Sequence, residues 1–182
     1  AAVVRDDAQF RGTHTEEVLV EVKDLKMFFP VTEGIFIHRV VAQVKAVNGV
    51  NFQIKKGETL GLVGESGCGK TTTGRCMIQL EQATSGEILY QGVDLTKLDS
   101  QEMIDYRKKI QIIFQDPFSS LNPRMTIGEI IDEPMKVHEI ISDPGERRQR
   151  VLELLEKCGL KTNFAERYPH EMSGGQRQRV GI

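Results

Sequence analysis

The sequence predicts an α/β fold in which an antiparallel β unit is followed by a strand–loop–helix unit and then by an inserted helical region. Three observations support this order. Short alternating or apolar segments bounded by turn residues fill the first third of the chain. A glycine-rich loop then joins an apolar segment to a helical one. After Pro117 helical periodicity dominates, which is typical of an α/β domain with a helical insertion.

The first part of the chain predicts an arm and then paired strands. Residues 1–17 are polar and aperiodic, so we expect a loose N-terminal arm. Residues 18–23 alternate apolar and polar side chains, as a half-buried strand does. Residues 30–34 are turn-like, and Asn48-Gly49 predicts a hairpin turn between two further strands.

The central part predicts a parallel sheet with helices. Residues 59–64 form a short apolar run that ends in glycine, which suits a buried parallel strand entering a tight loop. A helix is expected over residues 70–81 and a strand over the segment SGEILYQG. Residues 110–114, IQIIF, predict another buried strand.

The remaining helices carry recognisable start signals. Ser100 is the expected N-cap of one helix. Thr126 with Glu129 forms a capping-box pattern. Residues 144–160 form an amphipathic helix whose apolar side chains fall on one stripe. We place a helical subdomain at about residues 117–168, inside a domain that spans residues 18–182.

Composition narrows the class of function. The 182 residues have a formal net charge of −2, so no basic field points to nucleic acid, and we expect no nucleic-acid partner. The three cysteines have no metal-ligand spacing. No apolar run is long enough for a signal peptide or a membrane span, so any membrane role is expected to come through a partner.

One segment matches the phosphate-binding pattern G-x-x-x-x-G-K-[ST]. Glycines let the backbone pass close to an anion, and successive N–H groups form a nest at the helix start. We therefore expect a P-loop NTPase core that binds ATP, with a lysine near the β- and γ-phosphates and a threonine hydroxyl on Mg²⁺. The residues predicted to hold the nucleotide are Gly64, Glu65, Ser66, Gly67, Cys68, Gly69, Lys70, Thr71 and Thr72, of which Thr71 is also the predicted metal ligand.

A second motif identifies the type of P-loop protein. Ser173, Gly174, Gly175 and Gln176 follow Met172, and together they resemble the LSGGQ signature of ABC ATPases. Ser173 can cap the following helix, and the two glycines let the backbone approach an anion. In that family the signature meets ATP held by an opposite ATPase subunit. The resemblance therefore implies a head-to-tail dimer with nucleotide between the subunits, and an incomplete ABC ATPase domain in this chain.

Further segments resemble one branch of the family. Residues 114–131, FQDPFSSLNPRMTIGEII, are similar to the ATPases of peptide and nickel importers. Residues 31–47, 58–72 and 168–182 resemble the second ATPase subunit of oligopeptide and dipeptide permeases. The resemblance implies transmembrane permease subunits as partners, an extracytoplasmic solute-binding protein indirectly, and a peripheral place on the cytoplasmic face of a prokaryotic cell membrane. It assigns Gln115 to Mg²⁺ and the attacking water, and gives Gln115 and Lys70 catalytic roles.

An aromatic residue before the P-loop stacks on adenine in this family. The resemblance makes Phe29 the first candidate and Phe28 the second, with a core position as the alternative for either residue. Stacking of a base on an aromatic ring contributes about 1–3 kcal/mol.

Other functions stay open at this point. The chain ends shortly after Gln176, before the positions where the family has its Walker B aspartate, catalytic glutamate and switch histidine. We therefore expect negligible ATP hydrolysis by this chain alone, and a non-catalytic nucleotide-binding fragment or a nickel-importer ATPase are alternatives. A soluble ABC ATPase of DNA repair or translation is disfavoured by the segment QDPFSSLNPRMT. A GTPase is disfavoured because no NKxD motif occurs.

Overall fold

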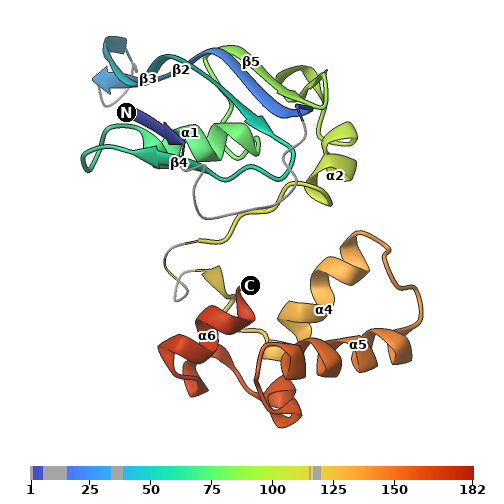
Figure 1. Ribbon diagram of the computed structural model, residues 1–182. Helices are drawn as coiled ribbons and strands as arrows, with labels where there is room; N and C mark the ends of the chain where they lie inside the picture. The colour runs from blue at the N-terminus through green and yellow to red at the C-terminus, as the bar shows by residue number, and fades with distance from the viewer. Residues whose placement is uncertain (1, 6–15, 34–38, 115, 117–119) are drawn as a thin grey trace. The chain divides into compact units, whose positions relative to one another are not determined.

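The chain forms two compact units, Ala1–Ile110 and Gln111–Ile182, each with its own apolar core. The structure is a computed structural model that describes residues 2–5, 16–33, 39–114, 116 and 120–182 (Figure 1). None of the helices in these ranges is long and apolar enough to cross a membrane.

The first unit is built on antiparallel strands (Figure 1). A four-stranded sheet has the order β3-β2-β5-β6, and a separate pair is formed by β1 and β4. The strands are β1 (Ala2–Arg5), β2 (Val18–Glu33), β3 (Arg39–Lys55), β4 (Leu60–Val63), β5 (Ser85–Tyr90) and β6 (Val93–Asp94). The β2–β3 pairing runs from Val18 to Glu33, whereas β5 pairs with β2 only up to Lys26. Beyond Lys26, β2 and β3 therefore continue as a two-stranded ribbon.

Two predicted turns lie inside strands, so both predictions are wrong. Pro30 and its neighbours continue β2, where Pro30 pairs with Gln43. Asn48 and Gly49 lie within β3, and Gly49 has a φ of 75°. Because Val50 pairs with Leu25 and Asn48 with Lys26, Gly49 is the extra residue of a β-bulge. A glycine with positive φ serves a bulge as well as a turn, so Asn-Gly alone does not separate the two.

The predicted parallel sheet is absent from the described residues, where every strand pair is antiparallel. β4, the expected parallel strand, pairs with β1, so part of the predicted loose arm is a strand. The segment IQIIF is not a strand, and Ile113 is 63% exposed. A strand that is apolar on both faces needs neighbouring strands to accept its backbone hydrogen bonds, and the described part of the chain places none beside it.

The helices of the first unit are shorter than predicted. α1 (Lys70–Met77) ends early because Gln79 has a φ of 56° and the chain leaves the helix there. α2 (Glu102–Arg107) is preceded by Asp99 rather than capped by Ser100. The Asp99 carboxylate accepts hydrogen bonds of 2.8 Å from the backbone N–H groups of Gln101 and Glu102. One carboxylate oxygen thus satisfies two donors at this helix start.

The core of the first unit lies between the sheet and its helices. The eight buried residues are Val22, Leu25, Met27, Val47, Cys76, Ile88, Leu95 and Met103. Cys76 comes from α1 and Met103 from α2, so both helices bury a side chain in this core. Burial raises the pKa of the Cys76 thiol, and the nearby Glu81 adds to the effect.

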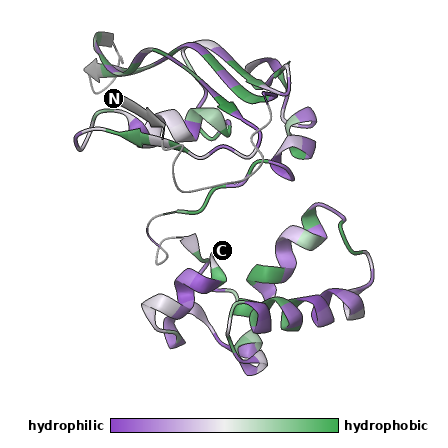
Figure 2. Ribbon diagram, viewed as in Figure 1, coloured by the Kyte–Doolittle hydropathy of each residue, from purple (hydrophilic) through white to green (hydrophobic). Residues whose placement is uncertain are grey.

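The second unit is helical (Figure 1). Its α-helices are α4 (Ile127–Val137), α5 (Pro144–Lys157) and α6 (Gly174–Val180), with 3-10 turns at Thr162–Glu166 and Pro169–Glu171. The predicted capping box of Thr126 and Glu129 is confirmed. In Figure 2 the first half of α5 is hydrophilic and hydrophobic residues follow in its second half. There Val151 and Leu155 enter the core, as the amphipathic pattern predicts.

Candidate functional site

The glycine-rich loop, residues 64–69, connects the end of β4 to the start of α1 (Figure 1). This is the predicted strand–loop–helix arrangement. Gly64, Glu65, Ser66 and Gly67 are exposed, whereas Cys68, Gly69 and Lys70 are half-buried. Gly67 and Gly69 have φ angles of 82° and 94°. Positive φ at both glycines lets the backbone curl back on itself between the strand and the helix.

The N-terminus of α1 is left without a side-chain cap. Its N-cap is Gly69, which has no side chain, and no side chain in the described residues accepts a hydrogen bond there. The first N–H groups of a helix have no partner within the helix and carry a partial positive charge. Such an uncapped end beside a curled glycine loop can receive an anionic oxygen.

The other side of the loop rests against strand β3. A Cβ atom built on Gly69 would lie 2.2 Å from the carbonyl oxygen of Ala46 and 3.5 Å from the Val47 side chain. No real Cβ fits at 2.2 Å from a backbone oxygen, so this position requires glycine for space as well as for its φ angle. β3 therefore fixes where α1 begins, a constraint that sequence reasoning missed.

The Lys70 ammonium group lies over the loop. Its Nζ donates hydrogen bonds of 2.8 Å to the Gly64 carbonyl and 2.7 Å to the Glu65 carbonyl. The Cys68 sulfur lies 3.5 Å from the same Nζ. An ammonium group has three donors: two of them bind the loop carbonyls, and the third, which makes a weak hydrogen bond to the Cys68 sulfur, can turn to an anion instead. The structure thus places the predicted lysine at the glycine-rich loop.

Thr71 and Thr72 follow in the first turn of α1. Thr71 is exposed and lies with Lys70 along a groove of about 410 Å³. The groove is lined by Phe52, Ile54, Leu60, Leu62, Lys70, Thr71, Gly74 and Met77. The Thr71 hydroxyl is a hard oxygen donor of the kind that Mg²⁺ prefers. Among the described residues no cluster of three His, Cys, Asp or Glu side chains could hold a metal by itself.

The two candidate aromatic residues have different surroundings. Phe28 is half-buried, its N–H donates to the Thr84 hydroxyl at 2.9 Å, and the Lys45 ammonium lies 5.6 Å from its ring centre. Phe29 is 36% exposed. Phe29 pairs with Val44 of β3 and Phe28 with Lys45, just after a register shift between Met27 and Phe28.

The predicted signature belongs to the second unit. Ser173 is the N-cap of α6, and Gly174 and Gly175 begin the helix. The Ser173 hydroxyl accepts from the Gln176 N–H at 3.3 Å, and the Gln176 side chain accepts from the Ser173 N–H at 2.9 Å. These reciprocal bonds form a capping box. The predicted capping role of Ser173 is confirmed, and Gln176 takes part in the same cap.

Gln115, the remaining predicted site residue, lies outside the described residues. Sequence reasoning also missed Thr73, which is 3% exposed and is the polar residue that the described chain buries most fully. Thr73 is the third consecutive threonine after Lys70, and this run was the sequence signal that could have drawn attention to it. Its burial depends on the direction in which α1 packs, and the sequence pattern does not give that direction.

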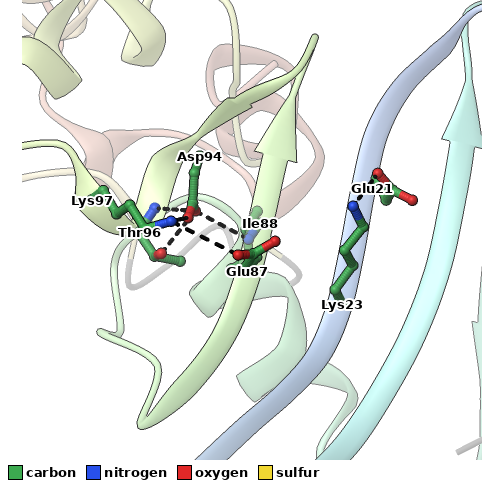
Figure 3. Close-up of polar contacts among 7 residues, drawn as sticks. All are labelled: Glu21, Lys23, Glu87, Ile88, Asp94, Thr96 and Lys97. Carbon is green, nitrogen blue, oxygen red and sulfur yellow. Dashed lines mark hydrogen bonds and ion pairs between the residues drawn. The ribbon is translucent and has the colours of Figure 1, made fainter.

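A polar cluster around Asp94 stabilises the turn after β5 without joining the site (Figure 3). Asp94 accepts from the Thr96 hydroxyl at 2.7 Å and from the N–H groups of Thr96 and Ile88, and the Lys97 ammonium lies 2.8 Å away. Burial alone would raise the pKa of Asp94, but together these donors hold it below the ordinary value. On β2, hydrogen bonds from Lys23 and from Gln53 of β3 likewise lower the pKa of Glu21.

Comparison with known proteins agrees with these features. Residues 47–182 match the ABC transporter family. The oligopeptide transport ATP-binding protein AppF of Bacillus subtilis (strain 168) is 53% identical over 92% of this chain and 50% of its own length. The dipeptide transport ATP-binding protein DppF of Escherichia coli (strain K12) is 47% identical over 92% of this chain and 49% of its own. The chain thus spans about half the length of these curated relatives.

A solved structure is also similar. The ATP-binding cassette MJ0796, in a dimeric post-hydrolysis state with bound ADP and Pi, superposes with a TM-score of 0.75 and 31% sequence identity. The match covers 89% of this chain and 66% of MJ0796. By its sequence over residues 47–182 and by this fold, the chain belongs to the ABC transporter family.

Proposed function

We propose that this chain is the nucleotide-binding part of an ATP-driven importer of oligopeptides or dipeptides. The observation that carries the proposal is the uncapped start of α1 beside the glycine-rich loop, with the Lys70 ammonium above it. Backbone N–H groups, a helix N-terminus and a cation converge there, which is the chemistry that recognises a triphosphate. Peptides as cargo are supported by the names of the relatives, which are oligopeptide and dipeptide transport proteins.

The nucleotide is proposed to lie along the loop with its base toward the β2–β3 ribbon. Glu65, Ser66, Gly67 and Cys68 supply backbone around the phosphates, and Phe29 offers its exposed ring to adenine. Mg²⁺, held by the hydroxyl of Thr71 with Gln115 as the second protein ligand, would supply Lewis-acid neutralisation of phosphate charge. Lys70 binds and orients the γ-phosphate as a catalytic residue by its position over the loop.

The assembly is proposed on the same basis. Residues 18–182 form an ABC ATPase domain with a helical subdomain at about residues 117–168. Two ATPase subunits associate head to tail, so that Ser173, Gly174, Gly175 and Gln176 of one meet nucleotide bound to the other. The pair docks on transmembrane permease subunits at the cytoplasmic face of the membrane, and a solute-binding protein delivers the peptide. The dimeric state of MJ0796 supports such a pairing.

Equilibrium binding of MgATP tests the nucleotide site directly. Lys70→Ala removes a charged donor, so we expect its affinity to fall by about tenfold to a hundredfold, the equivalent of 1.5–3 kcal/mol. Lys56→Ala is the matched control, because Lys56 is an exposed lysine of the same unit that pairs with Glu17. Equal MgATP affinity in Lys70→Ala and wild type would overturn the proposal.

Uptake of labelled peptides tests the cargo. Cells that carry Lys70→Ala in the whole protein should lose import of di- and oligopeptides and keep it with Lys56→Ala. Normal peptide uptake with loss of import of another solute would reject peptides as the cargo and retain the nucleotide site.

A further inference from the structure

Thr73 is a buried polar residue of α1 whose side chain bonds back to the end of the glycine-rich loop. The residue is 3% exposed, and its hydroxyl donates a 2.9 Å hydrogen bond to the carbonyl oxygen of Gly69. The Thr73 N–H donates to the same oxygen at 2.8 Å. Two donors from one residue thus hold the carbonyl of the residue that caps α1.

The carbonyl of Gly69 belongs to the same peptide group as the N–H of Lys70. A peptide group is planar and trans, so its C=O and N–H point in opposite directions. When Thr73 holds the Gly69 carbonyl along the axis of α1, the Lys70 N–H must point out of the helix start and into the loop. Hydrogen bonds to the carbonyl also polarise the peptide group, which makes its N–H a stronger donor.

Gly69 needs such a restraint more than an ordinary N-cap residue does. Its φ of 94° lies in a region that glycine enters and leaves easily, and no side chain caps this end of α1. The Ala46 carbonyl oxygen leaves no room for a Cβ on Gly69. The Thr73 hydroxyl is therefore the side-chain group that fixes the Gly69–Lys70 peptide from within the helix.

We propose that Thr73 is a positioning residue for phosphate binding, acting through the Gly69–Lys70 peptide to aim the Lys70 N–H at the anion. This inference rests on the proposed function and adds a residue that does not touch the ligand. A threonine that bonds back to the preceding turn of a helix without such a role would affect stability alone. The two roles separate when affinity and stability are measured on the same variants.

The experiment compares Thr73→Val, which replaces the hydroxyl by a methyl group, with Thr73→Ser, which keeps the hydroxyl. Affinities for MgATP and for inorganic pyrophosphate are measured, together with the amide chemical shift of Lys70 and the urea unfolding midpoint. We expect Thr73→Val to bind both ligands about three- to tenfold more weakly, the loss that corresponds to one neutral hydrogen bond. Its Lys70 amide resonance should shift, and Thr73→Ser should stay close to wild type in all three.

Thr96→Val is the matched control. Thr96 also donates its hydroxyl within the first unit, to Asp94 at 2.7 Å, and lies outside the glycine-rich loop. This variant should lower the unfolding midpoint and leave both affinities unchanged. If Thr73→Val does not fold, Thr73→Ala removes the same hydroxyl without adding a methyl group and takes its place.

The outcomes distinguish this inference from the proposed function. Wild-type protein that binds neither MgATP nor pyrophosphate contradicts both. Wild-type binding with equal affinity in the hydroxyl-free variant, whatever its stability, overturns the positioning role alone. A Thr73→Ser variant as weak as Thr73→Val also overturns it, because the hydroxyl would then be irrelevant.

Discussion

The helices α1 and α6 both begin at short glycine-containing segments, yet their N-termini are satisfied in opposite ways. At α6 the side chains of Ser173 and Gln176 close a reciprocal capping box. At α1 the N-cap is a glycine, and no described side chain takes its place. The difference teaches that a glycine motif at a helix start is not by itself an anion receptor. The receptor requires N–H groups that the protein leaves without an acceptor of its own.

The strongest test of this difference between α1 and α6 adds one methyl group to the glycine-rich loop. In Gly69→Ala the new Cβ would lie 2.2 Å from the Ala46 carbonyl oxygen, so either the loop or β3 must move. We expect loss of measurable MgATP binding, since the helix start would be displaced from the loop, and destabilisation by more than about 2 kcal/mol. Calorimetric titration and urea unfolding measure the two effects.

Gly67→Ala is the control for backbone strain. Gly67 also has a positive φ, but a Cβ there meets nothing within 4 Å. This variant should lose only about 1 kcal/mol of stability to strain. If both alanine variants behave alike, the contact with Ala46 does not define the site.

The next largest effect on MgATP affinity is expected where the adenine base is proposed to stack. Phe29→Ala should weaken MgATP binding by about 1–3 kcal/mol through loss of stacking and leave pyrophosphate binding unchanged. Phe28→Ala removes the ring that Lys45 covers and should alter stability rather than affinity. Titration of both ligands against both variants checks this, and a loss confined to Phe28→Ala would move the stacking role to that residue.

Asp94 is a polar side chain whose hydrogen-bond acceptors are occupied, as they are at α6, but its contribution to stability depends on pH. Its lowered pKa means that the ionised form stabilises the folded state. That contribution is fully present above the ordinary aspartate pKa, about 4, and is lost as pH falls through the lower folded value. Asp94→Asn should therefore cost about 1–2 kcal/mol at neutral pH, with the deficit shrinking in acid.

Urea unfolding of wild type and Asp94→Asn from neutral pH down to about pH 3 measures that deficit. A deficit that stays constant across this range would show that the charge of Asp94 contributes nothing. The capping box of α6 contains only neutral side chains, so no comparable acid dependence is expected from Ser173→Ala.

Local chemistry made parts of the fold and site predictable. The spacing of Gly64, Gly69 and Lys70 located the loop. Ser173 predicted a helix cap, and Thr126 with Glu129 predicted a capping box, because each depends on neighbours close in sequence. The partners of β4 and IQIIF depend on strands remote in sequence, and there the prediction of a parallel sheet was wrong. Gly49 was misassigned because one backbone angle serves both bulges and turns.

The smallest effect should come from the end of α6. Ser173→Ala removes the acceptor for the Gln176 N–H and should destabilise the protein by about 1 kcal/mol, the usual effect of losing an N-cap. Thr126→Ala, at the capping box of α4 in the same unit, is the matched control and should show a similar loss. Neither substitution should change the affinity of a single chain for MgATP, because the proposed contact of Ser173 is with nucleotide bound to the opposite subunit. A fall in affinity in Ser173→Ala but not in Thr126→Ala would mean that the cap of α6 opens to a nucleotide. Both helix starts would then bind nucleotide, and the capping box of α6 would not distinguish it from α1.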